Sequence, residues 1–102
     1  MREIMEVARY IRKELKMADE YAYEAVKHRE QFPDMAQHYY KVSMDHLTAA
    51  DDLHVGAVRM IDMAKRGGAE PSDVMKRVWE HEHEMMIDEK DCVMRKLNMF
   101  KA

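Results

Sequence analysis

The chain has 102 residues, of which 47% are hydrophobic and 36% are charged, and its formal net charge is −3. This length suits a single folded domain, and the interspersed charges of both signs do not form the basic surface of a nucleic-acid-binding protein. The single cysteine, Cys92, excludes a disulfide within the chain, and no apolar run is long enough to cross a membrane. We therefore expect a cytoplasmic protein.

Two breaks divide the sequence into three long stretches that we predict to be helices, near residues 3–31, 34–66 and 71–100. Pro33 marks the first break, because it disfavours helix in the residue before it and suits a first helical turn. At the second break we expect Gly67 to take the left-handed conformation that ends a helix, and Pro71 to open the next one. The fold class predicted is all-α, a single-domain bundle of three long antiparallel helices over residues 1–102.

The first predicted helix repeats apolar residues at alternating steps of four and three, which is the pattern of a helix with one buried face. The members of this series are Ile4, Ala8, Ile11, Leu15, Ala18, Ala22 and Ala25. Glu14 lies on the edge of the series, where a partly buried carboxylate needs a partner.

The second predicted helix has the same stepped pattern, with a histidine among otherwise small or apolar residues. The series is Ala36, Tyr40, Ser43, Leu47, Ala50, His54, Ala57 and Ile61. Residues three apart share one face of a helix, so Asp51-x-x-His54 can direct a carboxylate and an imidazole to one point. His46 lies eight residues from His54, about 12 Å along the axis, and belongs to a separate layer.

The third predicted helix carries a second acid–histidine pair, Glu80-x-x-His83, within an apolar series. That series is Met75, Trp79, Met86, Val93, Leu97 and Phe100. His81 cannot join His83 at one metal ion, because residues two apart on a helix point about 200° from each other. We interpret Cys92 as a small buried hydrophobic residue.

Antiparallel folding brings the polar residues of the three helices to similar heights. A turn centred at about residue 32.5 sets Glu14 level with Asp51 and His46 level with Asp19 or Glu20, and one centred at about residue 69 sets His54 near His83. The candidate metal ligands are Glu14, Asp51, His54, Glu80 and His83, with His46 in a second layer. The alternative is a buried salt-bridge network that binds no metal.

The sequence resembles the ferritin-like superfamily, particularly its rubrerythrin-like branch. The residues that carry the resemblance are Glu14 seven residues before Tyr21, the pairs Asp51-x-x-His54 and Glu80-x-x-His83, and Ser43-x-x-His46, which keeps the histidine of a Glu-x-x-His motif and loses the acid. It implies a di-iron site with ferroxidase-type or peroxide chemistry. Such sites draw on four helices. Either a second subunit completes the site, or it holds one metal ion, or the fold is kept without metal.

The function predicted is the binding of iron, or of manganese or zinc, by carboxylates and imidazoles inside the bundle. The alternative is a structural or interaction bundle with a polar core and neither metal nor catalysis. The sequence leaves open whether the protein is an enzyme, and indicates neither a nucleic-acid nor a membrane partner. Apolar residues outside the predicted core faces favour a homodimer. These residues are Met5, Met44, Val58, Ile87, Met94 and Met99.

Overall fold

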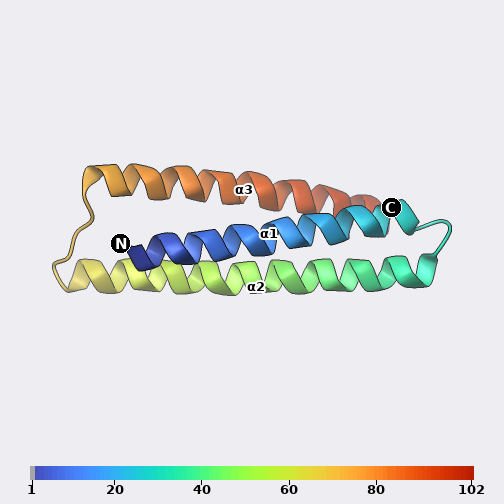
Figure 1. The fold of residues 1–102 in the computed structure, drawn as a ribbon, viewed down its shortest axis with the longest axis horizontal. Helices are drawn as coiled ribbons and strands as arrows, with labels where there is room; N and C mark the ends of the chain where they lie inside the picture. The colour runs from blue at the N-terminus through green and yellow to red at the C-terminus, as the bar shows by residue number, and fades with distance from the viewer. Residues whose placement is uncertain (1) are drawn as a thin grey trace.

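The computed structural model of the protein describes residues 2–102 as three helices joined by two short turns (Figure 1). The helices are α1 (Arg2–His28), α2 (Pro33–Arg66) and α3 (Asp73–Lys101). They form a rod of 56 × 18 × 18 Å in which α2 runs antiparallel to α1 and α3. The predicted all-α three-helix bundle is confirmed. None of the described helices is long and apolar enough to cross a membrane.

The first turn lies earlier in the chain than predicted. α1 ends at His28, three residues before the expected end, and the amide of Phe32 donates to the carbonyl of His28 at 2.9 Å. Phe32 lies outside the helical region (φ −133°, ψ 68°), in agreement with the restriction that Pro33 places on the residue before it. Arg29 leaves the helix and donates to the carbonyls of Met99 and Phe100 at 2.8 and 3.3 Å. The centre of the turn therefore moves from about residue 32.5 to about residue 30.5.

The second turn ends α2 with a Schellman motif. The amide of Ala69 donates to the carbonyl of Ala64 at 2.9 Å, and that of Gly68 to Lys65 at 3.1 Å. The left-handed residue is Gly68 (φ 80°) rather than the predicted Gly67. α3 then begins two residues later than predicted, because Ser72 caps it by accepting a hydrogen bond from the amide of Met75.

α1 lies between the other two helices and contributes more buried residues than either of them (Figure 1). All seven residues of its predicted apolar series are buried. The buried residues of α2 are Ala36, Ser43, Leu47, Ala50 and Ala57, and those of α3 are Met86, Val93 and Leu97. α2 and α3 contact each other at few positions, so both are held mainly through α1.

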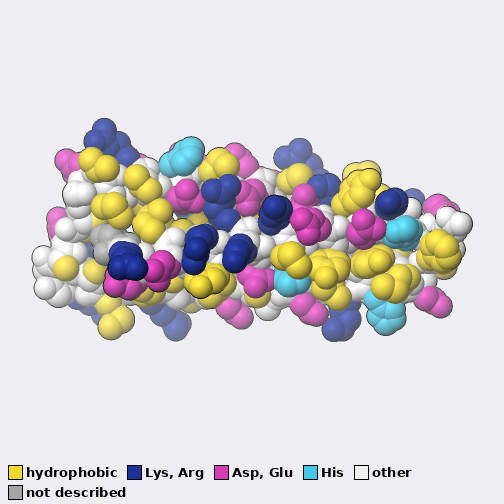
Figure 2. Space-filling model, in the orientation of Figure 1, with side chains coloured by type: hydrophobic (Ala, Val, Ile, Leu, Met, Phe, Trp, Pro, Cys, Tyr) yellow, Lys and Arg dark blue, Asp and Glu magenta, His cyan; other side chains and the backbone are white. Residues whose placement is uncertain are grey.

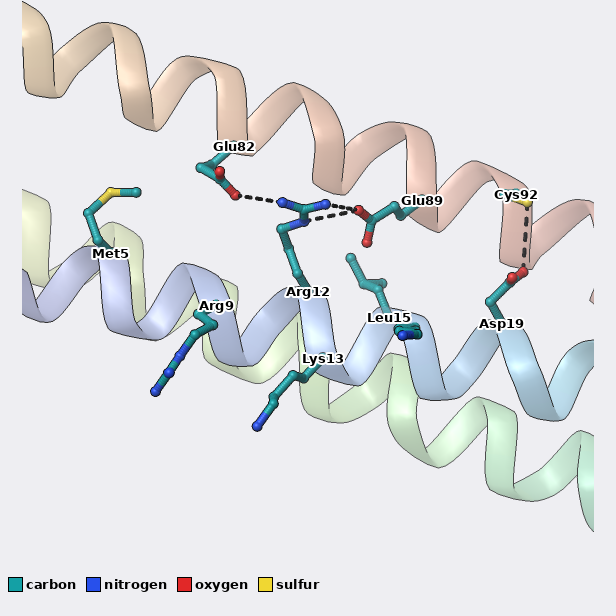
Figure 3. Close-up of a pocket in the computed structure, with 10 residues that line it drawn as sticks. Met5, Arg9, Arg12, Lys13, Leu15, Asp19, Glu82, Glu89 and Cys92 are labelled. Carbon is teal, nitrogen blue, oxygen red and sulfur yellow. Dashed lines mark hydrogen bonds and ion pairs between the residues drawn. The ribbon is translucent and has the colours of Figure 1, made fainter.

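Ion pairs supplement the apolar contact between α1 and α3. The guanidinium of Arg12 lies between two carboxylates of α3, 3.4 Å from Glu82 and 3.0 Å from Glu89 (Figure 3). Two helical turns further along the same two helices, Lys96 donates a hydrogen bond to Asp19. Since these pairs are partly exposed, each contributes at most about 1 kcal/mol, and the buried apolar residues account for most of the packing energy.

Candidate functional site

The carboxylate of Glu14 and the imidazole of His46 are in direct contact, with Oε2 and Nδ1 2.5 Å apart. The two side chains are 31% and 26% exposed. The predicted neighbours, Asp51 for Glu14 and Asp19 or Glu20 for His46, are therefore wrong. The earlier turn explains the error, because it moves the level opposite Glu14 from residue 51 to about residue 47.

This pair lies on the side of α1 that faces away from α3. Arg12 binds α3, and Glu14, two residues later, points about 200° from it. The ring of Tyr21 stacks on the imidazole of His46, with centroids 5.6 Å apart and planes at 8°. Tyr39 approaches Tyr21 at 6.1 Å. The pair is therefore bordered by aromatic rings along the seam of α1 and α2.

Ser43 occupies the position that would be acidic in a Glu-x-x-His motif, but it faces the core. Its side chain is fully buried, and Oγ donates to the carbonyl of Ala18 at 2.7 Å. His46, three residues later, lies at the surface of the same helix. Position 43 therefore offers no ligand to a metal bound beside Glu14.

His54 and His83 form a second group, in a cavity of about 170 Å³ between α2 and α3. Their ring centroids are 5.1 Å apart and their planes meet at 19°. The predicted proximity of these two histidines is confirmed. Asp51 lines the same cavity, but its carboxylate accepts a hydrogen bond from Lys90 at 3.0 Å.

The surroundings of His54 favour its neutral form. Burial lowers the pKa of His54, and the charges of His83 and Lys90 lower it further, while Asp51 acts in the opposite direction. A neutral imidazole has the free lone pair that a metal ion requires. Trp79 lies beside both imidazoles, and its ring centroid is 6.5 Å from that of His54 and 6.1 Å from that of His83.

The predicted ligands thus occupy separate places instead of one cluster. Glu80 is exposed and lines a different surface cavity with Lys65 and Lys76. Among residues 2–102, no three histidine, cysteine, aspartate or glutamate side chains converge well enough to hold a metal ion. One chain therefore offers two incomplete sets of ligands: Glu14 with His46, and His54 with His83.

Sequence reasoning missed the polar contacts of α3. Partial burial disfavours the charge of Arg12, but its hydrogen bond and attraction to Glu89, together with Glu82, outweigh this and raise its pKa. Glu82 and Glu89 are seven residues apart and so share a face, which was a usable signal of a common partner. Arg12, Glu82 and Glu89 also line a surface cavity of about 490 Å³ between α1 and α3 (Figure 3).

Cys92 is exposed, which corrects the prediction of a buried thiol. Its Sγ lies 3.5 Å from Nζ of Lys96 and 3.7 Å from the carboxylate of Asp19. Burial would lower the pKa of Lys96, but the hydrogen bond to Asp19 and its charge, with a contribution from Cys92, raise it overall. Of these contacts, those with Asp19 connect α3 to α1, whereas Cys92 and Lys96 are both on α3.

Most of the apolar residues outside the predicted core faces are confirmed as exposed. These are Met44, Val58, Ile87, Met94 and Met99, whereas Met5 is half-buried. They do not surround Glu14 and His46: Met5 lines the cavity between α1 and α3, and Ile87 lines the one between α2 and α3. The exposed apolar surface is therefore spread over more than one side of the rod.

No family model matches the chain, and neither the curated proteins nor the solved structures include a match to it. The resemblance to ferritin-like proteins therefore stays a prediction, and the functional argument depends on the geometry of the two groups above.

Proposed function

We propose that the protein binds a transition metal at Glu14 and His46, in a site that two chains complete by pairing through the outer side of α1 and α2. The observation that carries the proposal is the 2.5 Å contact between this carboxylate and this imidazole on a side that α3 leaves uncovered. One chain supplies two ligands, so a two-fold pair supplies two carboxylates and two imidazoles. Such a donor set suits iron, manganese or zinc.

The surface around the pair favours self-association. We call it the pairing face. Its residues recur at alternating intervals of three and four positions along each helix. Its residues are Val7, Tyr10, Glu14, Met17 and Tyr21 of α1, and Tyr39, Val42, His46, Ala49 and Leu53 of α2. Beyond Glu14 and His46 it contains no ionisable group other than tyrosine. Figure 2 shows hydrophobic and histidine side chains gathered over the C-terminal half of α1 and the adjacent part of α2.

The arrangement of the pairing face is symmetric about the proposed ligands. Glu14 and His46 are each the middle one of the five residues by which the face is defined on their helix. A two-fold axis at their level would therefore bring both ligand pairs together and bury apolar residues on both sides. All five α2 residues of the face are half-buried, so a second copy would complete their burial.

Gly56 supports close packing at the same side of α2, three residues beyond Leu53. A glycine inside a helix costs about 1 kcal/mol relative to alanine. Among residues 2–102 no close contact requires the glycine, because an added Cβ would meet no atom within 4 Å apart from the backbone of its own helix turn. A helix of a second chain packed closely against this position would explain the glycine, because a larger side chain would keep the two backbones apart.

The chemistry available depends on how many ions bind. Two iron ions held by Glu14 and His46 of both chains would supply oxidation of Fe(II) by dioxygen or peroxide, as the ferritin-like resemblance implies. The residues of the chain would hold the ions, and Tyr21 would keep the imidazole of His46 in position by stacking on it. The carboxylate of Glu14 would compensate part of the charge of the metal.

Metal analysis of protein purified without an affinity tag tests the proposal. The test uses His83→Gln protein, so that the group of His54 and His83 does not contribute. Loaded with Fe(II), Mn(II) or Zn(II) and then desalted, this protein should retain metal, whereas addition of Glu14→Gln or His46→Gln should remove most of it. Glu20→Gln and His38→Gln are matched controls, because both residues are exposed on the same helices. Equal retention in all five proteins would contradict the proposal.

A structural bundle without metal is the second candidate, and one observation favours it. Among residues 2–102, no buried side-chain nitrogen or oxygen lacks a hydrogen-bond partner. Glu14 and His46, which are partly exposed, are hydrogen-bonded to each other within the chain. Protein that pairs through this surface but retains no metal in the same assay would favour this candidate.

A further inference from the structure

We propose that His54 and His83 form a second metal site, within a single chain, that connects α2 to α3 through a borderline divalent ion such as Zn(II), Ni(II) or Cu(II). This site shares no residue with Glu14 and His46 and does not depend on pairing of two chains. Its role is structural, since it joins the two helices that otherwise contact each other least.

The separation of the two rings fits coordination of one ion. Two imidazoles bound to a tetrahedral ion at metal–nitrogen distances of about 2.0–2.1 Å have ring centres roughly 5 Å apart. The centroids of His54 and His83 are 5.1 Å apart, and their planes meet at 19° in a stacked arrangement. Because a bound ion lies in the plane of each imidazole, one ring would rotate about its side-chain bonds to direct its nitrogen at the shared ion. Both side chains are half-buried and both line the cavity between the helices. The two helices therefore hold the imidazoles close to a binding distance before any ion arrives.

Asp51 is positioned to become the third ligand. It lies one turn before His54 and lines the same cavity, while its carboxylate is bound to Lys90 across the groove. Because this ion pair is largely exposed, it costs little to break. Release from Lys90 would let Asp51 turn toward the ion, and water from the open cavity would complete the coordination shell.

Such a bridge would act where α3 is least attached. The described residues of α3 before Met86 include none that is fully buried, and the partly buried Trp79 is the residue of this half that packs against the core. His83 lies in that half, and His54 lies in the region of α2 opposite it. An ion shared by the two residues would restrict the opening of the groove.

Trp79 provides a direct reporter of the site. It is the only tryptophan in the sequence, and its ring lies 6.5 Å from His54 and 6.1 Å from His83. Ni(II), which is paramagnetic and does not oxidise the thiol of Cys92, should quench its fluorescence saturably at one ion per chain. His54→Gln and His83→Gln should each weaken this binding by about tenfold or more, and Asp51→Asn should weaken it by less.

Matched controls separate this site from other binding. His81→Gln should bind Ni(II) as the wild type does, because His81 is exposed and points away from His83. Glu14→Gln should also leave the quenching unchanged, whatever its effect on the first site. Thermal unfolding with added Zn(II) gives a second readout in a Glu14→Gln background, which removes the first site. The melting temperature of Glu14→Gln should rise, and that of Glu14→Gln combined with His54→Gln should not. Quenching that fails to saturate, or that is equal in wild type and His83→Gln, would overturn the proposal.

Discussion

Ser43 and His46 show how three residues of helix separate a core position from a surface position. Ser43 is fully buried and donates a hydrogen bond to the carbonyl of Ala18, whereas His46 contacts Glu14 beside solvent. An acid at position 43 would enter the contact between α1 and α2 instead of the proposed site. The apparent loss of an acid from Ser43-x-x-His46 therefore reflects the demands of the core.

Substitution of Ser43 tests this assignment. Ser43→Ala should lower the free energy of unfolding by about 1 kcal/mol, because it removes one buried hydrogen bond. Ser43→Glu should be several-fold more destabilising, since it buries a carboxylate without a partner. Urea unfolding followed by circular dichroism measures both. A stable Ser43→Glu variant with increased metal content would instead place residue 43 at the metal site.

At the scale of the helices, α3 depends on two kinds of contact with α1. Leu97 and Val93 are almost completely buried, and Arg12 forms ion pairs with Glu82 and Glu89. Burial of a leucine side chain stabilises by about 2 kcal/mol or more, while a partly exposed ion pair contributes at most about 1 kcal/mol. The apolar contacts should therefore decide whether α3 stays attached.

A comparison of two variants checks this ranking. Leu97→Ala should lower the free energy of unfolding by about 2–5 kcal/mol through lost burial and the cavity left behind. Arg12→Met, which keeps much of the apolar stem, should lower it by less than about 1 kcal/mol. Chemical denaturation at low and at high salt measures the free energy of unfolding of both variants. A larger loss for Arg12→Met than for Leu97→Ala would show that the ion pairs dominate.

The helices also show what the sequence could and could not predict. The apolar series of α1 was predicted in full, because a single repeating step defines the buried face of a long helix. The partner of Glu14 was predicted wrongly, because a shift of about two residues in the turn moves antiparallel neighbours by about four. That shift depends on Arg29, which leaves the helix to bind the distant end of α3. The neighbours His54 and His83 were predicted correctly, since the second turn is centred close to the expected position.

At the scale of the whole molecule, α1 and α2 form a hairpin with α3 on one side and the pairing face on the other. The chain has a mass of 12.2 kDa, and α3 provides less contact with α1 than α2 does. Pairing of two such hairpins through the pairing face would produce a four-helix arrangement with the proposed ligands at its centre. The exposed apolar residues on the other sides do not contribute to that centre.

Substitution of Val42 tests pairing through this face. Val42→Glu introduces a charge one turn from His46 and should convert a dimer into a monomer of 12.2 kDa in sedimentation velocity. Val55→Glu is the matched control, because Val55 is exposed on α2 outside the pairing face. A dimer that survives Val42→Glu but is lost in Val55→Glu would move the interface to another side of the rod.

Native mass spectrometry of tag-free His83→Gln protein loaded with Zn(II) tests most directly whether two chains share a metal at Glu14 and His46. The His83→Gln background removes the second proposed site, so any bound ion reports on the first. The account predicts metal only in species that contain two chains, and its loss from those species when Glu14→Gln is added. Metal carried by single chains, or two-chain species that take up none, would contradict it.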